Sequence, residues 1–171
     1  MNDSVVRLQL VRGIGLSSDL ISWWGGSYWG FSHADALMPD GTLIGARSDR
    51  IYHNGVWYPK GVQQRPAEYE QWKRRAIVTF HVQRWQSDYW ERLQSEGLGA
   101  QYNHLNIIEL ILGVKPTPDK HGRWICSARQ FNRLRLIGVF PALTIPDEEI
   151  TPDHLYLMSQ AVGAVIEERD W

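Results

Sequence analysis

The chain of 171 residues contains a single cysteine, Cys126. One cysteine excludes an internal disulfide framework and a zinc site built from several thiolates. The histidines other than His33 do not form a metal-ligand spacing with one another, so the sequence predicts no metal site. Stability must therefore come from packing.

The chain also lacks an excess of charge and a long apolar run. Its formal net charge is -1, which gives no electrostatic reason to expect a nucleic-acid partner. Nowhere do about eighteen apolar residues follow one another, and the N-terminus shows no signal-peptide pattern. We expect one domain, 1–171, without a membrane span and cytoplasmic, with delivery outside the cell by a route that needs no signal peptide left open.

Residue patterns predict an α+β fold with about five strands, mostly in the first half. Alternation and β-branched residues mark the strands, and small polar caps and glycine stops mark the helices. The predicted strands are 5–11, 32–38, 42–47, 61–66 and 76–82. The predicted helices are 17–24, 87–93, 105–112, 126–136 and one that starts after the Thr151 cap, with 68–75 a surface helix or loop. Pro39-Asp40-Gly41 and Asn54-Gly55 are turn signals.

Cys126 stands where apolar residues give way to a polar-flanked helix. At a helix start, free backbone N–H groups and the helix dipole stabilise an anion and so favour a thiolate. Most lone cysteines are small core residues, so position alone does not make this one a nucleophile. A partner is needed.

His33, at the start of its predicted strand, is the candidate partner, because an imidazolium stabilises a thiolate and can protonate a leaving group. The oxyanion of a tetrahedral intermediate would be held by the backbone N–H groups of Cys126 and Ser127. For a histidine taken alone, a hydrogen-bonded place in a polar rim is the ordinary alternative.

Several short motifs, in this order, resemble the circularly permuted papain-like cysteine hydrolases. They are Ser32-His33-Ala34, the Pro39-Asp40-Gly41 hairpin, Gly61-Val62 with Arg65-Pro66, Gln101-Tyr102-Asn103 and Trp124-Ile125-Cys126-Ser127. These enzymes are relatives of the NlpC-type peptidases, and the YiiX-like group is among them. The histidine precedes the cysteine, which is the permuted order. The resemblance implies a permuted papain-like fold, with an antiparallel sheet packed against helices and the nucleophile at a helix N-terminus. It also implies Cys126 as nucleophile, His33 as base and acid, and no cofactor.

The third, orienting residue departs from the family pattern. Counting from His33, the family position is Gly45, which has no side chain to offer. Three alternatives stay open: Asp35, on the same strand face as His33; Asp49 or Ser48, beyond the return strand; or a backbone carbonyl. We rank Asp49 ahead of Asp35, because a shifted hairpin register would bring Asp49 near the imidazole. The serine after Cys126 is followed by Ala128, where many permuted relatives have an acidic residue.

The candidate substrate-binding residues are Tyr28, Trp29, Arg47 and Trp124. For the aromatic residues core packing is an equal alternative, and for Arg47 a plain surface role is the commoner one. The resemblance implies hydrolysis of a peptide or amide bond, and such relatives commonly occur in bacteria and their phages, with cell-wall peptides among the substrates. A non-catalytic binding or virion-associated module on the same fold, and a thioesterase or acyltransferase, are the alternative functions.

Overall fold

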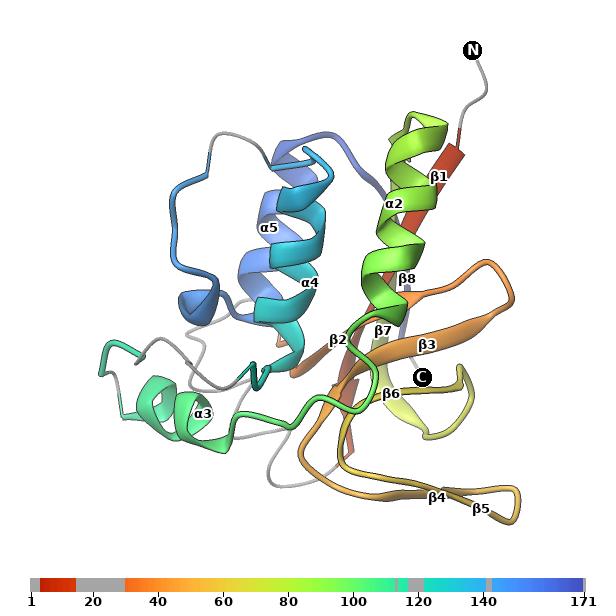
Figure 1. The fold of residues 1–171 in the computed structure, drawn as a ribbon, viewed down its shortest axis with the longest axis vertical. Coiled ribbons are helices and arrows are strands. Elements are labelled where there is room, and N and C mark those ends of the chain that lie inside the picture. Colours follow the sequence, from red (N-terminus) through yellow and green to blue (C-terminus); the bar gives the residue numbers. More distant parts are fainter. Residues whose placement is uncertain (1–3, 15–29, 113, 117–121, 141–142, 171) are drawn as a thin grey trace.

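The computed structural model describes all residues except 1–3, 15–29, 113, 117–121, 141–142 and 171. It is an α+β structure in which helices cover an antiparallel sheet of six strands, in the order β6-β3-β2-β1-β7-β8 (Figure 1). The strands of this sheet are β1 (Ser4–Gly13), β2 (His33–Leu37), β3 (Thr42–Arg47), β6 (Gly61–Pro66), β7 (Trp72–Val82) and β8 (Val165–Asp170). The described helices are α2 (Arg84–Ser95), α3 (His104–Ile111), α4 (Cys126–Leu136) and α5 (Pro152–Ala161), with a 3-10 turn η1 (Asp147–Glu149).

Strand β1 lies in the middle of the sheet, between β2 and β7. Val6, Leu8 and Leu10 alternate along β1 and are almost fully buried in the main core. Figure 1 shows α2, α4 and α5 side by side next to the sheet, and α4 contacts both β2 and β3. The buried face of α4 carries Phe131 and Leu134, so burial of apolar area fixes the helix that starts at Cys126 against the strand that starts at His33.

Many of the expected elements are confirmed. The hairpin of β2 and β3 forms around the predicted turn, and a second, two-stranded hairpin joins β4 (Ile51–His53) to β5 (Val56–Tyr58). Its two turn residues, Asn54 and Gly55, have φ angles of 47° and 81°, as a type I′ turn requires. Helix α4 has the predicted bounds, and α5 begins at Pro152 behind a Thr151 side-chain cap.

Other expectations were wrong or incomplete. Strand β8 was not predicted. Its charged sequence Glu-Glu-Arg-Asp has no strand pattern of its own, and the strand forms by pairing with β7. Residues 72–75 are not helix or loop but the start of β7. Helix α2 begins three residues before the predicted cap Ser87, with Gln83 and Gln86 forming its capping box. The predicted helix 17–24 lies outside the described residues.

Helix α3 forms where expected, but several of its described apolar side chains are not buried, contrary to the prediction of a core helix. Leu105, Ile108 and the following Leu112 are 49%, 53% and 70% exposed. The apolar pattern predicted the helix correctly, whereas what covers a helix depends on the rest of the fold. None of the helices in the described part of the chain is long and apolar enough to cross a membrane.

Candidate active site

Cys126 is the first residue of α4, and the chain before it is held in an extended path. The backbone of Trp124 bonds to Gln101 and Asn103 on both sides, at N···O distances of 2.9 and 3.0 Å. Ile125 then serves as the N-cap, with φ -92° and ψ 157°, and its side chain makes no cap hydrogen bond. The first-turn N–H groups of Cys126 and Ser127 therefore have no capping side chain and keep their capacity for an anion. The Ser127 hydroxyl is committed elsewhere, to the carbonyl of Ile150.

The structure brings Cys126 and His33 together. The Cys126 thiol and the His33 imidazole are close enough for each to shift the pKa of the other. The Nε2 atom of His33 lies 2.9 Å from Oδ1 of Asp35. A histidine at the start of β2 thus faces a cysteine at the start of α4, although 93 residues separate them in the chain.

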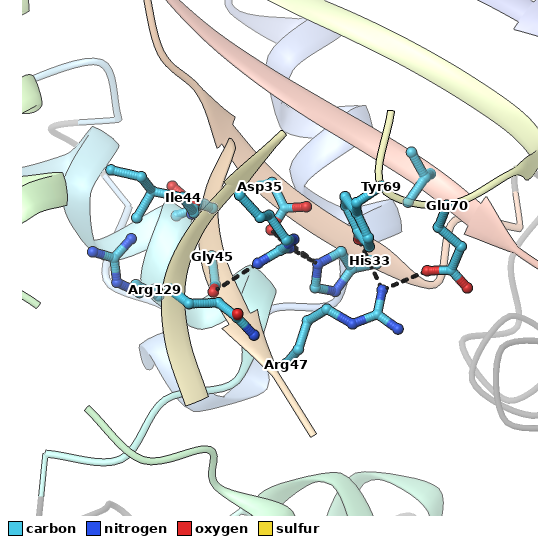
Figure 2. A network of polar contacts seen from close by, with 12 residues as sticks. His33, Asp35, Ile44, Gly45, Arg47, Tyr69, Glu70 and Arg129 are labelled. Atoms are coloured by element: carbon cyan, nitrogen blue, oxygen red, sulfur yellow. Dashed lines mark hydrogen bonds and ion pairs between the residues drawn. The ribbon is translucent and has the colours of Figure 1, made fainter. Parts of the chain in front are cut away.

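Asp35 is the carboxylate on the imidazole. It is fully buried, and its Oδ1 accepts hydrogen bonds from both His33 Nε2 and Arg65 Nη2, the latter at 2.6 Å. Figure 2 shows Asp35 and His33 converging beside Gly45. Arg65 Nη2 and His33 Nε2 are also 3.1 Å apart, but an arginine nitrogen and a protonated imidazole nitrogen are both donors. The shared acceptor between them is the Asp35 oxygen.

Gly45 gives the Asp35 carboxylate its space. The pairing of Ala36 with Ile44 in the β2–β3 ladder puts Asp35 directly across from Gly45. A Cβ atom built on Gly45 would lie 1.8 Å from Asp35 Oδ1, a separation that real atoms do not reach. The carboxylate of one strand therefore occupies the volume in which the neighbouring strand would carry its side chain. The glycine that looked like a missing orienting residue is what lets Asp35 reach the imidazole.

Asp49, which we ranked ahead of Asp35, is placed differently. It lies two residues beyond the end of β3 and accepts hydrogen bonds from Arg47 at 2.8 and 3.0 Å. The imidazole donates its Nε2 hydrogen bond to Asp35, so the structure favours Asp35 over Asp49 as the partner of the imidazole. The shifted register that would have favoured Asp49 does not occur, because β2 and β3 pair in step from their three-residue turn, Pro39-Asp40-Gly41.

The three groups shift one another's pKa values. Burial lowers the pKa of His33, but the negative charges of Asp35 and Cys126 outweigh it and raise that pKa to about 9. Burial raises the pKa of the Cys126 thiol, yet the charge and hydrogen bond of His33 bring it below its ordinary value. Burial also raises the pKa of Asp35, but Arg65 and His33 hold it well below its usual range. A lowered pKa of the thiol beside a raised pKa of the imidazole favours a thiolate–imidazolium pair.

A polar cavity of about 150 Å³ opens beside His33. Arg47 lies at this cavity, and it is not an exposed surface arginine, because its side chain is only 14% exposed. It bonds to Asp49, and Figure 2 shows it beside its other two partners, Tyr69 and Glu70. Cys126 is 3% exposed and does not line the cavity. The cavity is lined by Val11, Gly13, Ser32, His33, Ala46, Arg47, Ser48, Asp49, Glu70, Trp72 and Tyr102.

Of the other candidate substrate residues the structure describes only Trp124, and Trp124 is not at this cavity. Trp124 is half-buried away from its lining and lies under the guanidinium of Arg133, 5.3 Å from the ring centroid. Tyr28 and Trp29 lie outside the described residues. Within the described ranges, no cluster of three or more histidine, cysteine or acidic side chains is arranged to hold a metal ion.

Sequence reasoning did not assign a role to Arg65, Tyr69, Glu70 or Tyr102. Arg65 was noted only as part of a motif, although an arginine within a strand of otherwise uncharged residues is a signal for a buried partner. Tyr102 borders the cavity and interacts electrostatically with Cys126, and burial together with that interaction raises the pKa of its phenol. No model of a known protein family matches the sequence, and no curated protein matches it.

Proposed function

We propose that this protein is a cysteine hydrolase of the permuted papain-like type that acts on a peptide or amide bond. The observation that carries the proposal is the row of interacting groups from the Cys126 thiol through His33 to its hydrogen-bonded partner Asp35, with the sulfur at a helix start. A thiolate nucleophile, an imidazole that carries protons and a carboxylate that orients the imidazole are the parts this chemistry needs.

In the proposed reaction the Cys126 thiolate attacks the carbonyl carbon, forming a C–S bond while the carbonyl electron pair moves to oxygen. The backbone N–H groups of Cys126 and Ser127 hold this oxyanion. As it collapses, the C–N bond breaks and the His33 imidazolium gives its proton to the leaving amine. Water, deprotonated by His33, then hydrolyses the thioester and releases the acid. Asp35 keeps the imidazole turned toward the sulfur throughout.

The lining of the cavity favours a polar substrate. Arg47, Asp49 and Glu70 bring three charges to its wall, and a long acyl chain would leave them unsolvated. This argues for a peptide or amide and against the thioesterase or acyltransferase alternative.

Burial of the sulfur favours one competing function, a binding module that keeps the fold without turnover. At 3% exposure, Cys126 reacts only if a substrate carbonyl enters beside His33. If no substrate can reach the buried thiol, the cavity beside His33 can bind a ligand but the protein cannot cleave it.

Graded-pH alkylation separates the two functions. If the hydrolase proposal holds, iodoacetamide modifies Cys126 rapidly at neutral pH, and His33→Ala moves the titration to about 8.5 or higher, because burial then acts without an imidazolium. His81→Ala, at an exposed histidine of β7, is the matched control and leaves the titration unchanged. A wild-type thiol that titrates like free cysteine, or resists alkylation until the protein unfolds, would remove the hydrolase proposal.

A further inference from the structure

Arg65 is a charged side chain with almost no access to solvent. It is 1% exposed, lies on β6, and directs its guanidinium at β2 and β3. Nη2 donates to Asp35 Oδ1 at 2.6 Å and Nη1 donates to the carbonyl of Gly45 at 3.2 Å. The guanidinium also lies over the Tyr69 ring, 4.6 Å from its centroid. One arginine thus ties together the carboxylate and the glycine that makes room for it.

The Asp35 carboxylate has few other restraints. Only its Oδ1 is bound, since Oδ2 has no hydrogen-bond partner among the described residues. Without Arg65, a single contact to His33 would hold the group against rotation. Because Gly45 has no side chain to confine it, the carboxylate would also be free to turn away from the imidazole.

The charges form an alternating row: Arg65 positive, Asp35 negative, His33 positive and Cys126 negative. In such a row Asp35 has two opposite effects, since it stabilises the imidazolium but its charge also raises the pKa of the thiol. A cation on the far side of Asp35 reduces the second effect. Buried ion pairs bring little net stability compared with apolar packing, so stability alone does not explain why this pair is here.

We propose that Arg65 is a positioning residue of the site: it holds the Asp35 carboxylate in the space left by Gly45 and cancels that carboxylate's charge toward the Cys126 sulfur. The inference rests on the proposed function. It assigns a role in the site to a residue that touches neither the sulfur nor a substrate.

The test compares Arg65→Met, Arg65→Lys and Asp35→Asn by the ultraviolet absorbance of the thiolate as a function of pH. Removing the cation leaves the charge of Asp35 uncancelled toward the sulfur, so Arg65→Met moves the thiol step to higher pH by about one unit, which is about tenfold less thiolate below it. The carboxylate is also no longer held on the imidazole, so the imidazolium step, near 9 in the wild type, moves down in this variant. Asp35→Asn removes an anion and moves the imidazolium step down. Arg65→Lys keeps the charge and recovers most of the wild-type thiol titration.

Arg129→Met is the matched control, because Arg129 is equally buried but donates its hydrogen bonds to Gln94 on α2; it acts on Asp35 only electrostatically, without a hydrogen bond to that carboxylate, so its effect on the thiol step is the smaller of the two. A merely structural role for Arg65 would give both arginine variants the same loss of stability and an unshifted thiol step, and that result would overturn the inference. If Arg65→Met does not fold, Arg65→Met/Asp35→Asn removes both buried charges. Its imidazolium step must then match or exceed that of Asp35→Asn, and a step below it would overturn the inference. A wild-type thiol that titrates ordinarily would instead remove the proposed function itself.

Discussion

Gly45→Ala is the smallest change that tests the geometry of the site. The added Cβ would meet Asp35 Oδ1 at 1.8 Å, and real Cβ contacts stay beyond about 3.0 Å. The carboxylate must therefore move by about an ångström or more. That displacement breaks or weakens its hydrogen bonds of 2.6 Å to Arg65 and 2.9 Å to His33.

The loss of stability in Gly45→Ala follows from the buried charges that lose their partners. Disrupting a buried ion pair costs about 3–5 kcal/mol, because a charge remains desolvated without its partner. In an Asp35→Ala background the clash is absent, and glycine to alanine in a strand then stabilises by about 0.5–1 kcal/mol. We expect Gly45→Ala to lower the free energy of unfolding by about 3 kcal/mol or more in the wild type and to leave it equal or higher in the Asp35→Ala background.

Urea unfolding of the four proteins in this cycle gives the coupling energy directly. Thiolate absorbance on the same samples reports the site, and the neutral-pH thiolate of Gly45→Ala falls together with its stability. The reasoning would be refuted by a Gly45→Ala effect that is the same in both backgrounds, since the two positions would then not share one volume.

Three further predictions concern acid stability, the cavity and a distant cap. Because the pKa of Asp35 is depressed in the folded state, its contribution to stability is present above the unfolded value of about 3.9 and is lost as pH falls toward the folded value; Asp35→Asn flattens that acid limb in urea titrations. Arg47, Asp49 and Glu70 sum to one negative charge at the cavity, so Glu70→Gln raises the ratio of iodoacetate to iodoacetamide reaction at Cys126 by about two- to fivefold, and an unchanged ratio would separate the cavity from the sulfur. Thr151→Ala removes the side-chain cap of α5 and lowers the free energy of unfolding by about 1 kcal/mol, with no change in the thiol titration.

The elements that carry Cys126 and His33 were predictable because their signals are local. The β2–β3 hairpin follows from its turn residues, and α4 follows from an apolar face and polar flanks within eleven residues. Strand β8 and the exposure of α3 depend on distant partners. No local pattern shows that β7 will pair with a charged strand end, or that Leu105 and Ile108 of an apolar helix will be exposed.

The role of Asp35, the third residue of the site, could not be predicted from local sequence patterns. Position 45 and position 35 are ten residues apart in sequence, but the ladder places them side by side, so a carboxylate on either strand can reach the same volume. The absence of a side chain at position 45 makes room for the carboxylate of Asp35. That carboxylate is also held from the side that faces β6, where Arg65 donates to it and to the carbonyl of Gly45, so residues of three strands form one arrangement.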